Sequence, residues 1–252
     1  METGTEPSMS EAEVDATADI DAMPDIKPDA TSDAGLVTKP ETLPKPSTDR
    51  QRFDMVVRED FFAGFAGDQA RLQRGMEECR RVLKDNPDHA EAMVWLGSGE
   101  VFSSGERFEK GDFPGGIQLW QSGLSKMDRA IELEPDSVSV LIPRAATLLP
   151  ASRSLRGGMK QQILQRLQRD FERVYERQKD QLAEIGEHPL GELRMGLADV
   201  YRAQGKLAES NYQLTKLTEE LPDTDYAERA TKWLAAKPDA VLAHNCIGCH
   251  SG

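Results

Sequence analysis

The 252-residue sequence has only three cysteines, Cys79, Cys246 and Cys249, which are too few for a disulfide framework. It has no run of about 18 apolar residues, so it predicts no membrane-spanning helix. Basic residues are also in the minority, with 31 Lys and Arg against 44 Asp and Glu, a formal net charge of −13. Because binding to nucleic acid phosphates needs a basic surface, the composition argues against a nucleic acid partner.

Residues 1–50 contain no aromatic side chain and carry twelve acidic against four basic residues. The other 202 residues therefore hold only −5 of the total charge. A segment of this composition buries too little apolar area to offset its loss of conformational entropy. We expect residues 1–50 to form a disordered acidic tail.

From Phe53 to about residue 236, apolar residues recur at helical spacing between short breaks. Three breaks share the same dipeptide, Pro-Asp, at Pro87, Pro135 and Pro222. A proline lacks the backbone N–H that the first turn of a helix leaves unpaired, so it ends one helix and suits the start of the next. The pattern predicts an all-α domain over residues 53–236.

The segment Gly191–Thr224 resembles one tetratricopeptide repeat (TPR), a 34-residue pair of antiparallel helices. With Pro222 as the closing proline, the repeat's other consensus positions carry residues of suitable size, namely Leu197, Ala198, Tyr201, Gly205, Ser210, Leu214 and Leu217. The resemblance implies that Ala198 and Ser210 face each other where the two helices cross, with Tyr201 and Leu214 beside them.

A second unit that resembles the repeat begins near Ala90 and has its matching residues at Leu96, Gly97, Gly123, Met127, Ala130 and Pro135. Its two halves are about 14 residues further apart than in the 34-residue repeat, which predicts an insertion near residues 105–116. A half unit precedes it, with matches at Gly75, Cys79, Val82 and Pro87. The resemblance extends over about residues 68–236, loosely around the long charged helix expected at 158–182. It implies a TPR-like array of antiparallel helix pairs whose groove binds a protein partner.

The C-terminal segment 237–252 reads as a linker followed by Cys246-Ile-Gly-Cys249-His250. This string matches the attachment motif of c-type haem. Two thiols three positions apart can each add to a haem vinyl group, and the adjacent histidine then supplies the proximal nitrogen to the iron. The motif predicts covalent haem c on Cys246 and Cys249, with His250 as the iron ligand.

Two other interpretations of this segment stay open. His244, Cys246, Cys249 and His250 offer four zinc ligands, although structural zinc sites usually recruit a second loop. The other is that the segment holds no cofactor. Distal iron ligands from the helical region could be His89, His188 or Met195, but two helix-capping histidines and a core methionine are the more ordinary interpretation.

The remaining features have ordinary explanations. The aromatic residues of the insertion are expected to pin it to the scaffold, Cys79 to be a buried small hydrophobe, and the basic residues of 153–177 to form a solvated helix face. We find no phosphate-binding loop, nucleophile elbow or metalloprotease pair, so the sequence does not argue for an enzyme.

As a whole, the sequence resembles bacterial TPR proteins that end in a c-type haem motif. The resemblance implies a scaffold that binds a protein partner and transfers electrons through iron, and a periplasmic or other extracytoplasmic location, where such haem is attached. The start, Met1-Glu-Thr-Gly-Thr-Glu-Pro-Ser, lacks the basic and apolar regions of a signal peptide. We therefore expect a targeting segment outside this sequence. The alternative is a cytoplasmic TPR interaction module without haem.

Overall fold

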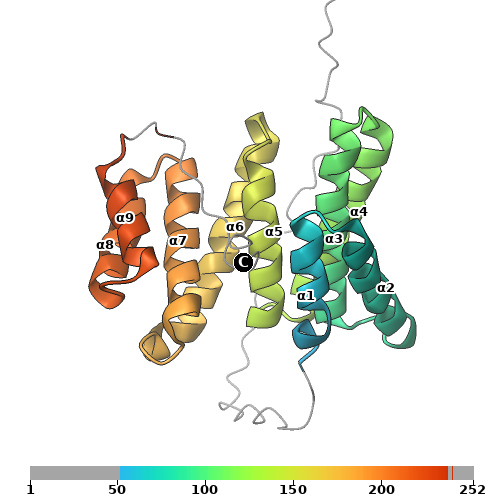
Figure 1. Ribbon diagram of the computed structural model, residues 1–252, viewed down its shortest axis with the longest axis horizontal. Coiled ribbons are helices and arrows are strands. Elements are labelled where there is room, and N and C mark those ends of the chain that lie inside the picture. The colour runs from blue at the N-terminus through green and yellow to red at the C-terminus, as the bar shows by residue number, and fades with distance from the viewer. Residues whose placement is uncertain (1–51, 238–239, 241–252) are drawn as a thin grey trace, which may run out of the picture. The chain divides into compact units, whose positions relative to one another are not determined.

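The computed structural model describes residues 52–237 and Ala240 (Figure 1). The expected tail 1–50 and most of the segment 237–252 lie outside the described residues. Within the described part, α-helices and one 3-10 turn account for the secondary structure, and no strand occurs. The predicted all-α class is confirmed there. The elements are α1 (Asp54–Phe65), α2 (Gln69–Asp85), α3 (Ala90–Glu109), α4 (Phe113–Leu133), α5 (Val138–Ser152), α6 (Gly157–Gln178), η1 (Lys179–Gln181), α7 (Glu187–Ala203), α8 (Leu207–Glu220) and α9 (Asp225–Ala235).

The three prolines mark helix boundaries at the same position each time. Pro87, Pro135 and Pro222 each stand three residues before the next helix begins, at α3, α5 and α9 respectively. Two of these helices then begin at a capping side chain: His89 accepts from the N–H of Ala92, and Thr224 from the N–H of Ala227. These predicted boundaries are confirmed.

Each helix packs mainly on its neighbours in sequence, and α3 also packs on α5 (Figure 1). In the α3–α4 pair, residues of α3 near the connecting loop contact residues of α4 near the loop, and residues further from the loop contact each other. A Cβ built on Gly116 would meet the ring of Phe108, and one built on Gly123 would meet Val101 further from the loop. The chain therefore reverses direction between α3 and α4.

The backbones of α3 and α4 approach closely at a pair of glycines. A Cβ on Gly97 would lie 2.7 Å from the carbonyl oxygen of Gly123, and a Cβ on Gly123 would lie 2.7 Å from that of Gly97. Real Cβ atoms are essentially never this close to another atom, and a backbone carbonyl cannot move aside as a side chain can. Both positions therefore require glycine while the helices keep this separation.

The crossing of α7 and α8 has the predicted register. Ser210 Oγ donates a hydrogen bond of 2.8 Å to the carbonyl oxygen of Ala198, and both residues are fully buried. Leu214 is fully buried nearby in the same helix, and Tyr201 is half-buried. The expectation that Ala198 and Ser210 face each other is confirmed.

The expected insertion at 105–116 is largely helical. It lengthens the end of α3 and the start of α4, and only residues 110–112 lie between these helices. Gly111 takes φ +77° in the turn, and Asp112 then caps α4 by accepting from the N–H of Gly115 at 3.0 Å. The rings of Phe108 and Phe113 lie across the turn with centroids 6.3 Å apart. Phe102 and Trp120 pack against the buried core, as expected of aromatic residues that pin the insertion to the scaffold.

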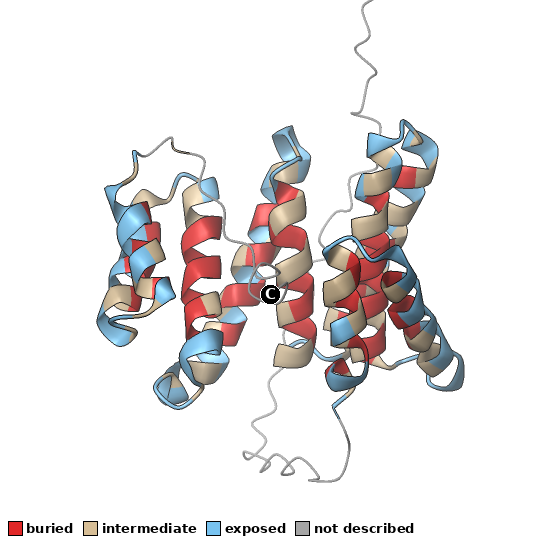
Figure 2. Ribbon diagram, viewed as in Figure 1, coloured by how far each residue is buried: buried red, intermediate tan, exposed pale blue. Residues whose placement is uncertain are grey.

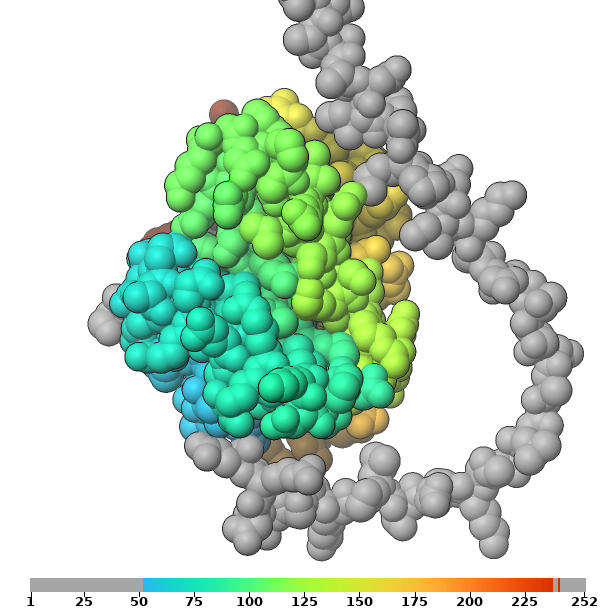
Figure 3. Space-filling model, turned by 90° about the vertical axis from the view of Figure 1, so that its right-hand side faces the viewer, coloured from blue at the N-terminus to red at the C-terminus, as the bar shows by residue number. Residues whose placement is uncertain are grey.

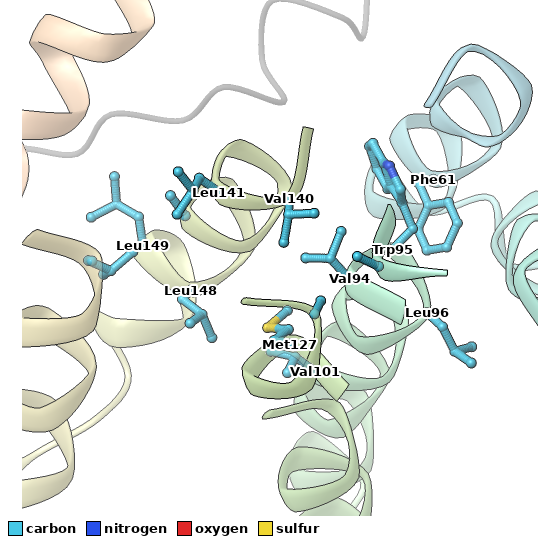
Figure 4. Close-up of a cluster of buried hydrophobic side chains, with 14 of the residues drawn as sticks. Phe61, Val94, Trp95, Leu96, Val101, Met127, Val140, Leu141, Leu148 and Leu149 are labelled. Atoms are coloured by element: carbon cyan, nitrogen blue, oxygen red, sulfur yellow. The ribbon is translucent and has the colours of Figure 1, made fainter. Parts of the chain in front are cut away.

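The middle of α3, residues 94–101, and the middle of α7, residues 193–200, consist entirely of buried residues (Figure 2). The larger apolar cluster joins α1 to α7 and includes Phe61, Trp95, Met127 and Leu148, drawn close up in Figure 4. The face formed by α1, α2 and the α3–α4 pair is seen in Figure 3. A smaller cluster joins α7 to α8 and α9 and contains Met195, Ala198, Leu214, Leu217, Tyr226, Ala230 and Trp233. α7 therefore contributes side chains to both clusters.

Candidate functional site

The predicted haem or zinc ligands, Cys246, Cys249, His250 and His244, lie outside the described residues. The structure describes where the chain leaves α9 on its way to them. Arg202 Nη2, at the end of α7, donates to the carbonyl oxygen of Lys237. The N–H of Ala240 donates to the same oxygen at 3.0 Å. The segment leading to the motif therefore starts beside the C-terminal end of α7.

His89 is a helix cap, as its ordinary interpretation predicts. Its Nδ1 accepts from the backbone N–H of Ala92 at 3.2 Å, and its ring lies 5.0 Å from that of Phe53. An accepting Nδ1 carries a lone pair, so in the neutral ring the proton is on Nε2. This tautomer leaves Nε2 as a donor rather than as a metal ligand.

His188 is not the cap of α7, because Gly186 stands at the cap position, so the capping interpretation of this histidine is wrong. A hydrogen-bonded relay between α7 and α9 instead gives His188 the opposite tautomer. Tyr226 Oη donates to Glu192 Oε1 at 2.8 Å, since a carboxylate can only accept. Tyr226 has one hydroxyl proton, so at its 2.7 Å contact with His188 Nδ1 the histidine must be the donor. In the neutral ring of His188 the proton is therefore on Nδ1, and Nε2 carries the lone pair.

The relay is held in place by packing around Tyr226, which is 6% exposed. Its ring lies flat against α7 at Gly191, where a Cβ would come within 2.6 Å of three ring atoms. The guanidinium carbon of Arg229 lies 5.6 Å from the ring centroid, in reach of a cation–π attraction. His188 itself is exposed at the start of α7. The tyrosine is thus a buried anchor that orients an exposed imidazole.

The other candidate ligand and the remaining cysteine of the helical region are both buried. Met195 has no exposed surface and belongs to the smaller apolar cluster. Cys79 is also fully buried, and burial raises the pKa of its thiol to about 12. The interpretations of Met195 as a core residue and of Cys79 as a small buried hydrophobe are confirmed.

The basic residues of 153–177 form more than a solvated face. Arg153 pairs with Asp199 on α7 at 2.9 Å, and Arg166 pairs with Asp128 on α4 at 2.8 Å. Arg156, Arg169, Arg173 and Arg177 are exposed, and the last three line a shallow cleft of about 300 Å³ with Asp136, Glu172 and Glu176. Arg166 therefore ties α6 to α4, and Arg153, which directly follows α5, ties the end of that helix to α7.

A buried ion pair joins α5 to α6. Arg144 Nε lies 3.2 Å from Asp170 Oδ2, and Arg144 Nη2 lies 3.0 Å from Asp128 Oδ1 on α4. Burial raises the pKa of Asp170 to about 6, although the charge of Arg144 opposes that shift. Both residues are 4% exposed, so the pair has little access to any substrate and serves to connect three helices.

A second cleft, of about 500 Å³, lies between α2 and the α3–α4 pair. Its lining is mixed and mostly polar, and comprises Gln69, Gln73, Met76, Arg80, Ser103, Glu106, Arg107, Lys110, Asp112 and Leu119. In the described residues, no group of three or more His, Cys, Asp or Glu side chains is placed to hold a metal ion. The relay at His188 remains the most specific chemical arrangement in this part of the chain.

Searches among protein-family models, curated proteins and solved structures found no match to this chain. None of the helices in the described residues combines the length and the apolar character needed to cross a membrane.

The sequence alone singled out His188 but not its two partners. Tyr226 and Glu192 stand 38 and 4 positions away from it. The spacing of His188 and Glu192 places them on one face of a helix, and this was an available signal. The third member comes from another helix, and single-sequence periodicity does not identify such contacts.

Proposed function

We propose that this protein is a haem-bearing helical-repeat scaffold that binds a protein partner and transfers electrons through iron. The observation that carries the proposal is the string Cys246-Ile-Gly-Cys249-His250. Cys246 and Cys249 would hold the haem through thioether bonds, and His250 would bind its iron. The bound group would supply an iron centre able to change oxidation state.

The scaffold part of the proposal is a TPR-like array of antiparallel helix pairs, formed by α1 to α9. Three observations support it: the reversal of the chain between α3 and α4, the repeated proline boundaries, and the Ala198–Ser210 crossing. A fourth is that α7 and α9 run in the same direction. His188 near the start of α7 contacts Tyr226 at the start of α9, and Arg202 near the end of α7 contacts Lys237 just after α9. This alternation is what stacked helix pairs produce.

The partner would be a protein bound in the groove of this array. Covalent attachment of haem normally takes place outside the cytoplasm, so the proposal includes an extracytoplasmic, for example periplasmic, location. A partner that exchanges electrons would have to bring its own redox centre close to the C-terminal motif.

The test is to produce the full chain together with a c-type maturation system and to measure its pyridine haemochrome spectrum after denaturation and acid–acetone extraction. We expect haem to stay on the chain. Replacing both Cys246 and Cys249 by Ala should remove it, whereas Cys79→Ala, the matched control, should retain it. A protein in which Cys246 and Cys249 are both free thiols and whose mass shows no added haem would refute the proposal.

The alternative is a TPR interaction module whose C-terminal segment binds zinc or nothing. The donor set of His244, Cys246, Cys249 and His250 favours zinc as the second candidate. It predicts a colourless protein with one zinc ion per chain, which is lost when His244 is replaced by Ala. In the haem proposal, His244→Ala leaves the covalent haem in place.

A further inference from the structure

The larger of the two clefts depends on the segment that lengthens α3 and α4. Four of its lining residues lie within residues 105–116, namely Glu106, Arg107, Lys110 and Asp112. α2 lines the opposite side from Gln69 to Arg80. The volume of about 500 Å³ is within the usual range of small-molecule sites. The extra length of the α3–α4 pair therefore completes a cleft of ligand size.

Both carboxylates that line this cleft are engaged by groups of the protein. Glu106 accepts a hydrogen bond from the side-chain amide of Gln69. Asp112 pairs with Arg107 at 2.9 Å, and it also accepts from the N–H that begins α4. Neither carboxylate is thus left to neutralise the other cations of the lining.

Two cations of the lining have no counter-charge. The side chains of Arg80 and Lys110 are exposed, and neither forms a hydrogen bond or an ion pair with a described residue. The lining has three cations against two carboxylates and is therefore positive by one charge, in a chain whose formal net charge is −13. The cleft is a locally basic site on an acidic protein, which favours an anionic ligand.

The two unpaired cations lie toward opposite ends of the cleft. Gln69 and Arg80 are eleven positions apart in α2, which corresponds to about 16–17 Å at 1.5 Å per helical residue. Lys110 follows Glu106 by four positions, and Glu106 contacts Gln69. Lys110 is therefore at the Gln69 end, and a ligand that pairs with both cations must be elongated.

The rest of the lining supplies apolar contact and an unsatisfied hydroxyl. Met76 and Leu119 contribute apolar surface. Ser103 Oγ is buried and has no hydrogen-bond partner among the described residues, whereas Ser98 and Ser104 of the same helix donate to backbone carbonyl oxygens. A buried hydroxyl without a partner is unfavourable, so the cleft lacks a polar group that would satisfy it.

We propose that this cleft binds a small, elongated organic dianion. One acidic group, a carboxylate or a phosphate, pairs with Arg80 and the other with Lys110, while the apolar middle of the ligand contacts Met76 and Leu119. Arginine suits such groups because its planar guanidinium binds two oxygens at once, and the lysine ammonium attracts them as a point charge. The site uses no residue of the C-terminal motif, so it goes beyond the proposed function and does not depend on haem.

The experiment titrates the full chain with linear dicarboxylates from butanedioate to dodecanedioate and follows backbone amide chemical shifts by two-dimensional NMR. We expect saturable shifts at Gln73, Ser103 and Lys110. Butanedioate is too short to reach both cations and should bind more weakly than a longer member of the series. The monocarboxylate of the same length as the tightest ligand should bind about two- to fivefold more weakly, which is the contribution of one exposed ion pair. The terminal bisphosphate of that length is a second arm, and the tighter of the two dianions identifies the acidic group.

Arg80→Gln and Lys110→Gln should each weaken the tightest dicarboxylate by about two- to fivefold, to the affinity of the monocarboxylate. Lys84→Gln is the matched control, because it removes an exposed lysine of the same α2 helix outside the cleft, and it should leave the affinity unchanged. All three side chains are exposed, so the far-ultraviolet circular dichroism should be the same in every variant.

Three results would overturn this inference: no saturable shift at the cleft, equal affinity of the dicarboxylate and the monocarboxylate, or an Arg80→Gln variant that binds like the parent. Each of them leaves the haem proposal intact, because the titration measures the cleft and not the C-terminal motif. Absence of haem would likewise leave the binding at the cleft unchanged.

Discussion

A sharp prediction concerns two glycines of the same helix, Gly97 and Gly105 in α3. In a helix interior, Gly→Ala is normally stabilising by about 1 kcal/mol, because alanine loses less backbone entropy on folding. A Cβ at Gly105 would meet nothing within 4 Å, so Gly105→Ala should show this gain. A Cβ at Gly97 would lie 2.7 Å from the Gly123 carbonyl oxygen, and α3 and α4 would have to separate.

The expected change in the free energy of unfolding is the cost of overpacking minus the gain in helix propensity. Overpacking of a well-packed contact costs about 1–3 kcal/mol, so after the gain of about 1 kcal/mol Gly97→Ala should range from neutral to about 2 kcal/mol destabilising. The free energies of unfolding of the two variants should thus differ by about 1–3 kcal/mol. Urea titration with both variants and the parent measures this difference directly. If the two substitutions shifted the stability by the same amount in the same direction, the proposed contact between α3 and α4 would be refuted.

Three further predictions concern the buried interior. Ala198→Leu should lower the free energy of unfolding, measured by urea titration, by about 1–3 kcal/mol, because Ala198 is buried. Ala208 is exposed, so Ala208→Leu should leave this free energy almost unchanged, and equal losses in the two variants would contradict the α7–α8 register. Cys79 should resist iodoacetamide at pH 8 in a folded variant with Cys246 and Cys249 replaced by Ala, and should react in urea, because burial raises the pKa of its thiol to about 12. The pKa of Asp170 is about 6 in the folded state, raised by burial from its ordinary value of 3.8, so between these two pH values the folded state binds more protons than the unfolded state. The unfolding free energy should consequently fall by at most about 3 kcal/mol as pH rises from about 4 to about 6, and Asp170→Asn should flatten this slope.

The sequence predicted well those features that depend on local spacing. The boundaries at Pro87, Pro135 and Pro222 and the facing of Ala198 and Ser210 follow from helix chemistry and from one repeat-like segment. The helix boundaries and the facing pair each depend only on residues within about one helix pair. Helical periodicity carries that information without knowledge of the rest of the chain.

The sequence predicted less well where local propensity and packing disagree. The glycines near residues 105–116 indicated a break, but only Gly111 takes a positive φ in the turn, and the close contact of Gly116 with Phe108 gives a packing reason for a helical glycine. α5 contains Pro143 and Pro150 in its interior, where each removes a helical hydrogen bond. Pro143 and much of α5 are nevertheless buried, so tertiary packing outweighs the local penalty.

Because α7 contributes to both apolar clusters, the described helices are expected to unfold in a definite order. The smaller cluster is formed by seven residues, and two of them, Met195 and Ala198, belong to α7 itself. The larger cluster contains no residue of α8 or α9, so these helices lose their apolar contact with the other described helices if they leave α7, whereas α7 keeps Leu193, Leu197 and Val200 in the larger cluster. Amide hydrogen exchange should release α8 and α9 together, at a lower opening free energy than α7. The relay at Tyr226 spans that boundary, so any ligand that tightened it would raise the opening free energy of the last two helices without touching the rest.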